Sequence, residues 1–220
     1  AKRITRSGNL AFDLSRGGGW DVYLIEVNPA TGESGSPKLV TESFFGQHMR
    51  SAWSADGTKL AYLRTRQEGR APLLCLMSLA DGREETFETG MRYMNSVFLS
   101  PDGKSAALAP AGPADKYGIH IFTFETRALR PIVLSGDFRP KGFSADGKEF
   151  LLFQAGKRNE NVAVDITTGT ERKIMFAESV ENNNYDLSPD GSRIVYVANE
   201  PDSKRRQLVL SDIGFKDKRI

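Results

Sequence analysis

Short apolar runs separated by polar turns recur along the whole chain, and none of them has the 3.6-residue spacing of an amphipathic helix. A representative unit is an apolar strand that ends at Trp53, a turn at residues 54–57, and a second apolar run that begins at Leu60. Apolar runs of this length, bounded by Gly, Pro, Asp and Ser, are typical of β-strands. The pattern therefore predicts an all-β chain.

The turn occurs four times, as Ser-Ala-Asp-Gly or Ser-Pro-Asp-Gly, at a nearly constant interval. The aspartates of the four copies are 46, 44 and 44 residues apart, and they are Asp56, Asp102, Asp146 and Asp190. In such a turn the Asp side chain accepts hydrogen bonds from nearby backbone, and the glycine takes a positive φ. One aspartate per repeat would not converge on one ion, so we interpret all four as turn residues. The interval itself is typical of propeller blades.

Four strands per interval make one blade, so the sequence predicts a β-propeller of about five four-stranded blades in a single domain, residues 1–220. The first blade, from Leu10 to Val40, lacks its opening strand. Residues 3–5 supply either that strand or the outer strand of a blade upstream. The first case gives a closed five-bladed ring and the second a part of a six- or seven-bladed ring, and the sequence leaves both open.

The turn and its flanks resemble the WD-type propeller repeat of TolB-like proteins. Residues 187–194, Leu-Ser-Pro-Asp-Gly-Ser-Arg-Ile, show the pattern of a Leu or aromatic residue, the turn, two polar residues and an apolar strand. The resemblance covers residues 9–220. It implies a bacterial, non-enzymatic protein-binding or scaffold module, located in the periplasm if TolB-like and otherwise in the cytoplasm. The alternative is the substrate-gating propeller of a prolyl-oligopeptidase-like hydrolase, because fold does not fix function.

Composition and charge narrow the classes of partner. The chain is 39% hydrophobic and 26% charged, and its 30 basic and 28 acidic residues leave a net charge of +2. A nearly neutral chain lacks the basic excess of a nucleic-acid binder, and no run approaches the roughly 18 apolar residues that cross a membrane. We therefore predict no nucleic-acid partner and no membrane insertion. The one cysteine, Cys75, lies in an apolar run, and we expect a core thiol.

Motifs for catalysis are missing from the sequence. It has no G-x-S-x-G, H-E-x-x-H, Walker or C-x-x-C pattern, so we predict no catalytic residue, cofactor or metal. His120 lies within a strand, whereas His48 begins an inner strand and is more open to a functional role. A lyase-type site in the channel would need carboxylates or histidines clustered on the inner strands, which carry only Asp186 and His48.

The inner strands of a propeller line its central channel, so polar residues on these strands are candidates for a binding site at the channel mouth. These residues are His48, Arg50, Asn95, Arg139, Lys141, Asn183 and Asn184. The alternative interpretation is that they are ordinary solvated residues.

The loops between the second and third strands of the blades are expected at the same face, and they are rich in basic residues. Their basic residues are Arg16, Arg64, Arg66, Arg70, Lys116, Lys157, Arg158, Lys204, Arg205 and Arg206, against Glu68, Asp115, Glu160, Glu200 and Asp202. We hypothesise that this face binds an acidic peptide or protein segment, with Arg64, Arg66 and Arg158 making carboxylate contacts. A solvated rim without a partner is the alternative.

Overall fold

The computed structural model consists of β-strands joined by turns, and the residues it describes contain no helix long and apolar enough to cross a membrane. The structure describes residues 9–16, 19–28, 30–41, 48–66, 70–110, 118–154, 161–174, 185–187, 193–199, 206–212 and 216–219. The chain divides into two compact units, Ala1–Pro131 and Ile132–Ile220.

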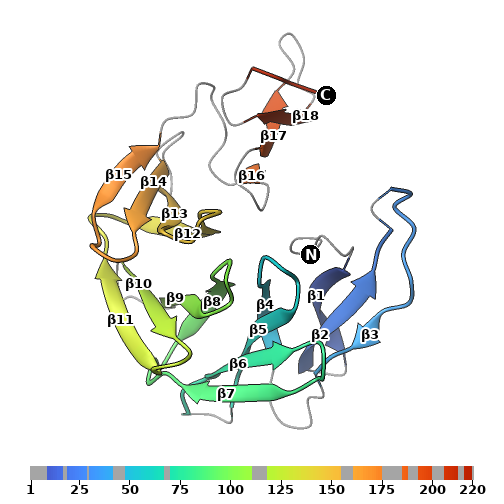
Figure 1. Ribbon diagram of the computed structural model, residues 1–220, viewed down its shortest axis with the longest axis vertical. Helices are drawn as coiled ribbons and strands as arrows, with labels where there is room; N and C mark the ends of the chain where they lie inside the picture. Colours follow the sequence, from blue (N-terminus) through green and yellow to red (C-terminus); the bar gives the residue numbers. More distant parts are fainter. Residues whose placement is uncertain are drawn as a thin grey trace. The chain divides into compact units, whose positions relative to one another are not determined.

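Unit 1 contains three antiparallel sheets, which we number blades 1 to 3 (Figure 1). Blade 1 has the strands β1 (Asn9–Arg16), β2 (Gly19–Glu26) and β3 (Lys38–Leu39). Blade 2 has β4 (His48–Trp53), β5 (Lys59–Arg64), β6 (Leu73–Ser78) and β7 (Glu84–Glu88). Blade 3 has β8 (Met94–Leu99), β9 (Ser105–Pro110), β10 (Gly118–Thr123) and β11 (Ala128–Val133), whose last two residues belong to unit 2.

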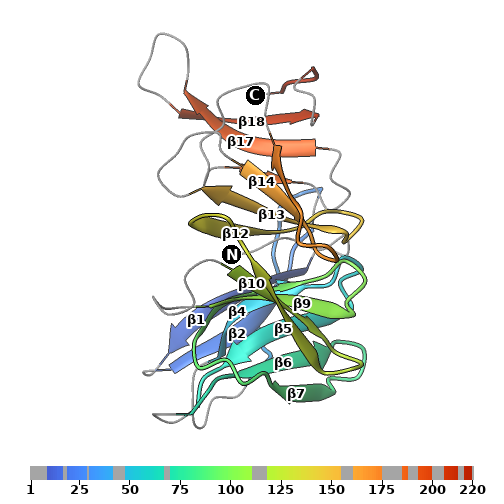
Figure 2. The ribbon, with the colours of Figure 1, turned by 90° about the vertical axis from the view of Figure 1, so that its left-hand side faces the viewer.

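Unit 2 contains blades 4 and 5. Blade 4 has the strands β12 (Phe138–Phe143), β13 (Glu149–Gln154), β14 (Asn161–Asp165) and β15 (Glu171–Ile174). Blade 5 has β16 (Tyr185–Leu187), β17 (Arg193–Asn199) and β18 (Arg206–Asp212). In every blade, strands that follow one another in sequence pair antiparallel, as Figure 2 shows for β13 with β14 and for β17 with β18.

The predicted all-β propeller architecture of five blades is confirmed, with three or four strands in each described sheet. Blade 1 lacks an opening strand among its described residues, since β1 aligns with the second strand of the other blades. Blade 5 differs from the prediction, because its expected fourth strand is reduced to one bridge between Leu210 and Arg219 in the described chain. Residues 3–5 lie outside the described residues, so ring closure stays a prediction, as does the single domain.

The repeated turn folds as its composition predicts. In the first copy, the Ser54 hydroxyl donates to the Asp56 carboxylate over 2.5 Å, and the Thr58 amide donates to the same oxygen over 3.0 Å. These two hydrogen bonds lower the pKa of Asp56. Gly57 takes a φ of 72°, which glycine adopts without a steric penalty. The copies at Asp102 and Asp146 repeat these bonds, and the copy at Asp190 lies outside the described residues.

The core of unit 1 lies between its blades, and alternate residues of one strand belong to two different interfaces. Leu60 and Tyr62 of β5 pack with Ala11 and Val22 of blade 1. Ala61 and Leu63 of the same strand pack with blade 3. We call the side of a blade that packs on the preceding blade its trailing face and the other side its leading face. Cys75 lies on the trailing face of blade 2, fully buried, and burial raises its pKa to about 11, as expected for a core thiol.

Candidate protein-interaction site

The inner strand of blade 2 carries a bulge that joins it to blade 1. The pairing register of β4 with β5 shifts between Met49 and Ala52, and Arg50 within this bulge has a φ of 63°. This conformation directs the Arg50 amide to the Asp13 carboxylate over 2.8 Å, and the Ser51 hydroxyl donates to the same carboxylate over 3.1 Å. A non-glycine residue in this region of φ is strained, and such strain persists only where the surroundings hold it. Asp13 therefore holds the backbone that presents the Arg50 side chain.

Two of the predicted site residues meet across the boundary between blades 2 and 3. The Arg50 guanidinium donates a hydrogen bond to the Asn95 side-chain oxygen over 3.2 Å, and both residues are exposed. Asn95 lies at the bulge of β8, where register shifts between Met94 and Ser96, as it does in β4. Arg50 and Asn95 thus form a preorganised polar pair whose guanidinium stays open to solvent.

His48, by contrast, is enclosed. Its ring is 3% exposed, its Nδ1 lies 3.3 Å from the Asp21 carboxylate, and its Nε2 lies 2.9 Å from the Nε of Arg64. Burial and the neighbouring Arg64 charge lower the pKa of His48. With both ring nitrogens bonded inside the protein, His48 joins blade 1 to blade 2 and presents no free nitrogen to a ligand.

Arg64 and Arg66 are both engaged in ion pairs within blade 2. Arg64 contacts the Glu84 carboxylate over 2.5 Å, and the Tyr62 hydroxyl donates to the other oxygen of that carboxylate. Arg66 contacts Glu88 over 2.8 Å and donates to a backbone carbonyl over 2.7 Å. Burial raises the pKa of Glu84. Arg64 therefore has two of its guanidinium nitrogens bonded within the protein, to His48 and Glu84, whereas the pair of Arg66 with the exposed Glu88 can open at little cost.

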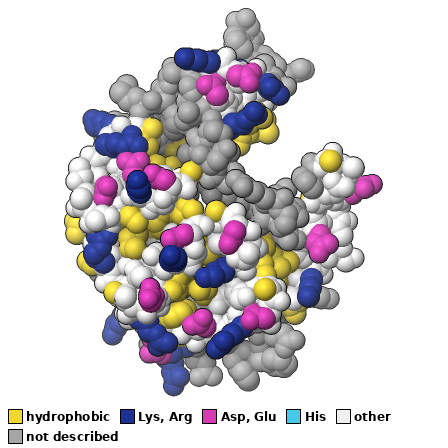
Figure 3. Space-filling view, viewed as in Figure 1, with side chains coloured by type: hydrophobic (Ala, Val, Ile, Leu, Met, Phe, Trp, Pro, Cys, Tyr) yellow, Lys and Arg dark blue, Asp and Glu magenta, His cyan; other side chains and the backbone are white. Residues whose placement is uncertain are grey.

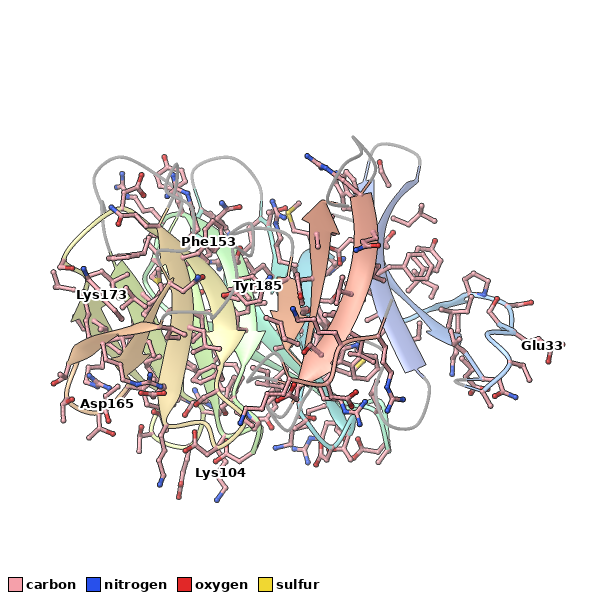
Figure 4. All side chains as sticks on the ribbon, turned by 90° about the horizontal axis from the view of Figure 1, so that it is seen from above. Glu33, Lys104, Phe153, Asp165, Lys173 and Tyr185 are labelled. Carbon is pink, nitrogen blue, oxygen red and sulfur yellow. The ribbon has the colours of Figure 1, made fainter. Side chains whose placement is uncertain are left out.

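The predicted residues in unit 2 have local partners. Arg139 is exposed and pairs with Asp137 over 2.6 Å. Lys141 donates to the Tyr185 backbone carbonyl, and its ammonium lies 4.4 Å from the centre of the Tyr185 ring. Figure 4 labels Tyr185. Tyr185 also donates its hydroxyl to the Asn161 side chain over 3.0 Å, so Lys141 and Tyr185 join blade 4 to blade 5. Arg158, Asn183 and Asn184 lie outside the described residues.

One end of blades 2 and 3 carries several basic residues and an exposed aromatic residue. Arg64, Leu73 and Glu88 are aligned in adjacent strands, so the segments that follow β5 and β7 leave blade 2 at the same end. Tyr93, which precedes β8, is 61% exposed. We call this group the basic rim, and its members are Arg50, Arg66, Arg70, Arg92, Tyr93 and Asn95.

Arg92 and Tyr93 were not among the residues selected from the sequence. They lie between the fourth strand of one blade and the inner strand of the next, whereas the sequence argument considered only the loops between second and third strands. An exposed Tyr between Arg92 and the polar start of an inner strand is the signal that could have identified them. On the face of unit 1 that Figure 3 shows, basic and acidic side chains are interspersed.

The described residues contain no group of three His, Cys, Asp or Glu side chains that could hold a metal ion. Asp13 and Asp21 both contact the inner strand of blade 2, and each is bonded to backbone or side-chain donors of the protein. The basic rim presents guanidinium and phenol side chains, which are groups suited to contacts with carboxylates and aromatic rings.

Comparisons with known proteins support the fold. No protein-family model and no curated protein sequence matches this chain. Among solved structures it is similar to TolB from Acinetobacter baumannii, with a TM-score of 0.65 and 18% identity over 96% of this chain and 50% of that one. It is also similar to a structure of the nidogen/laminin complex, with a TM-score of 0.58 and 11% identity over 98% and 75% of the two chains.

An enzyme structure is similar as well, a prolyl endopeptidase with a TM-score of 0.54 and 17% identity, over 96% of this chain and 34% of that one. This chain thus spans half the length of the TolB structure and about a third of the endopeptidase. The structural similarity supports the β-propeller fold. Sequence identities this low leave the activity open.

Proposed function

We propose that this chain is a non-enzymatic protein-binding module that receives an acidic segment of a partner protein on the basic rim. The observation that carries the proposal is the exposed guanidinium of Arg50, which donates to Asn95 while Asp13 binds the Arg50 backbone amide. It lies at the end of the blades where Arg92 and Tyr93 are also exposed. A guanidinium with a fixed position binds a carboxylate at a smaller entropic cost than a mobile one.

Charge and aromatic content both favour this partner. The basic rim contains four arginines, Arg50, Arg66, Arg70 and Arg92, and Glu88 pairs with only one of them. Tyrosine and arginine are the residue types that most often anchor protein interfaces, because they offer large contact area together with hydrogen bonds. An acidic segment with an apolar or aromatic residue beside its carboxylates fits this combination.

The test is a binding titration with a fluorescein-labelled peptide that alternates Glu with Leu and Tyr, at low and high ionic strength. We expect wild-type binding to weaken with salt, and the double variant Arg50→Glu, Arg92→Glu to lose most of its affinity. Lys104→Glu, at the opposite end of blade 3, is the matched control and should bind like wild type. Equal affinity of the double variant and wild type would refute the proposal.

The alternative is the gating propeller of a prolyl-oligopeptidase-like hydrolase, for which the similarity to a prolyl endopeptidase structure provides the support. In that case the catalytic groups belong to a separate domain of the same polypeptide. The two functions differ in a peptidase assay of the full-length gene product with a proline-containing fluorogenic peptide. Hydrolysis that an active-site serine inhibitor blocks would favour the gating function, and its absence would favour the binding module.

A further inference from the structure

His48 is a buried histidine on the strand that presents Arg50 to the basic rim. The chain has two histidines, and His48 lies two residues before Arg50 at the start of β4, where it is 3% exposed. Two residues of chain separate their Cα atoms by at most about 7 Å, which is less than the screening length of about 8 Å at physiological ionic strength. A charge on His48 would therefore act on an anion bound at Arg50.

The hydrogen bonds of the His48 ring hold it in its neutral form. Its Nε2 accepts the Nε–H of Arg64 over 2.9 Å, and since a guanidinium has only donors, the ring proton is on Nδ1, 3.3 Å from the Asp21 carboxylate. An imidazole ordinarily titrates nearest to neutral pH among the side chains that meet here. The other charged or titratable groups around it in the described chain are Asp21 of β2, Tyr62 and Arg64 of β5, Glu84 of β7 beyond Arg64, and Asp13 of β1 at the adjoining bulge.

Protonation of His48 breaks its bond with Arg64, because both nitrogens then carry a hydrogen. The Nδ1–H keeps its acceptor on Asp21, whereas the Arg64 Nε–H loses its acceptor and the two positive charges repel each other. The Arg64 side chain is 28% exposed, and Arg64 is the last residue of β5, before the segment that carries Arg66. Both effects add positive charge or a free donor at the end of blade 2 that carries the basic rim, which favours an anion there.

We infer that the basic rim binds its acidic partner segment more tightly when His48 is protonated. The inference rests on the proposed function and adds a control of it by protons. Binding and protonation are linked, so an acidic segment on the rim must favour the protonated ring by the same factor. Burial and the Arg64 charge lower the pKa of His48 in the free chain, so the gain in affinity develops as the pH falls below the ordinary value of 6.5.

The test is a calorimetric titration of the chain with the peptide of alternating Glu, Leu and Tyr, without its label, at pH 5.5 and pH 7.5. The Glu side chains of the peptide ordinarily titrate near pH 4.3 and stay mostly ionised over this range. We expect the affinity of wild type to rise about threefold or more at the lower pH.

Two histidine variants show which group carries the effect. His48→Gln should bind equally at both pH values, because the amide stays neutral while it can still accept from Arg64 and donate to Asp21. His120→Gln, at the other histidine of the chain, is the matched control and should keep the wild-type dependence.

The outcomes separate this inference from the proposed function. Salt-dependent binding at pH 7.5 with unchanged affinity at pH 5.5 would overturn the inference and leave the proposed function intact. A pH dependence that persists in His48→Gln would overturn it as well, since another group would then carry the effect. Absence of salt-dependent binding at both pH values would overturn both.

A second measurement does not depend on the folding of the His48 variant. Proton NMR of wild type follows the ring signals of both histidines from pH 5 to pH 8, without and with saturating peptide, and the spectrum of His120→Gln assigns them. We expect the pKa of His48 to rise by about 0.5 or more with peptide bound, which is the same threefold factor, and the His120 signal to follow one curve in both conditions. A His48 pKa that the peptide leaves unchanged would overturn the inference. Circular dichroism at each pH checks that the strands persist.

Discussion

Arg64 donates its Nε–H to the Nε2 atom of His48 over 2.9 Å, and this bond decides the tautomer of a buried histidine. A guanidinium has only donors, so His48 Nε2 must carry its lone pair and Nδ1 must carry the proton that faces Asp21. The chain Asp21, His48, Arg64, Glu84 thus runs from blade 1 across blade 2 with each donor matched to an acceptor. Protonating His48 would place two donors against each other at Nε2.

Stability is therefore expected to fall as pH decreases below the ordinary histidine pKa of 6.5. The pKa of His48 is lower in the folded chain than in the unfolded chain, so the unfolded chain binds a proton first as the pH falls. The free energy of unfolding therefore decreases as the pH falls from 6.5 to the pKa of the folded chain. One such group contributes at most about 1.4 kcal/mol per pH unit. Urea denaturation from pH 5 to pH 8 measures the slope, and His48→Gln should reduce it. An unchanged slope in that variant would show that His48 does not titrate on unfolding.

The Arg64 and Glu84 pair should contribute to stability as a unit. Arg64→Ala leaves Glu84 and His48 Nε2 without this donor, and we expect a loss of about 1–3 kcal/mol. Glu84→Gln should cost less, because Gln still accepts a hydrogen bond. A double-mutant cycle measured by denaturation gives the coupling energy, and additive effects would show that the two side chains act independently. Charge reversal at Arg64 would therefore change the stability of the fold, so its effect on partner binding could not be interpreted alone.

Substituting Arg50 by Gly should separate stability from binding. Glycine accepts a φ of 63° without strain, so we expect Arg50→Gly to be as stable as wild type or more stable by up to about 1 kcal/mol. The same variant lacks the guanidinium and should lose affinity for the acidic peptide. Asp13→Ala should lower stability, because the Arg50 amide and Ser51 hydroxyl lose their acceptor. Thermal melts and the peptide titration report the two properties separately.

Two turn glycines form a matched pair for measuring close packing. Gly82 and Gly103 have φ values of 70° and 65°, so Ala is strained at both. At Gly82 an added Cβ meets nothing within 4 Å, whereas at Gly103 it would lie 3.3 Å from the Lys59 side chain of blade 2. Gly82→Ala should cost about 1 kcal/mol and Gly103→Ala more than that. Equal losses in chemical denaturation would mean that Lys59 moves aside freely.

Tyr185 tests the contact between blades 4 and 5. Tyr185→Phe keeps the ring beneath the Lys141 ammonium and removes the hydroxyl that Asn161 accepts, so we expect a loss of about 1 kcal/mol. Lys141→Met removes the cation and keeps the apolar stem, and it should cost about 0.5–1 kcal/mol. Burial raises the pKa values of Tyr185 and Tyr196, so alkaline difference spectra should show tyrosines that ionise only at higher pH than free tyrosine, and Tyr185→Phe should remove one of them. Normal titration of all tyrosines would contradict the buried placement.

The sequence alone determined the fold, because the Ser-x-Asp-Gly turn and the alternation of apolar residues are local properties. Turn hydrogen bonds span five residues, and the repeat interval shows how many strands each blade contains, so both are visible without coordinates. Leu60 and Ala61 lie on opposite faces of blade 2 because successive side chains of a strand alternate between its two faces. These features also led to Arg50 and Asn95 as site candidates.

Only the tertiary structure decided which polar residues are available to a partner. His48 and Arg64 match exposed binding residues in composition, yet their partners Asp21 and Glu84 lie on other strands and become neighbours only through strand pairing and blade packing. Likewise, Leu76 and Leu210 occupy the same place in the repeat, yet Leu76 is 8% exposed because it packs with residues of blade 3, whereas Leu210 is 37% exposed. Pairing and burial depend on contacts between distant segments, which a local pattern does not contain.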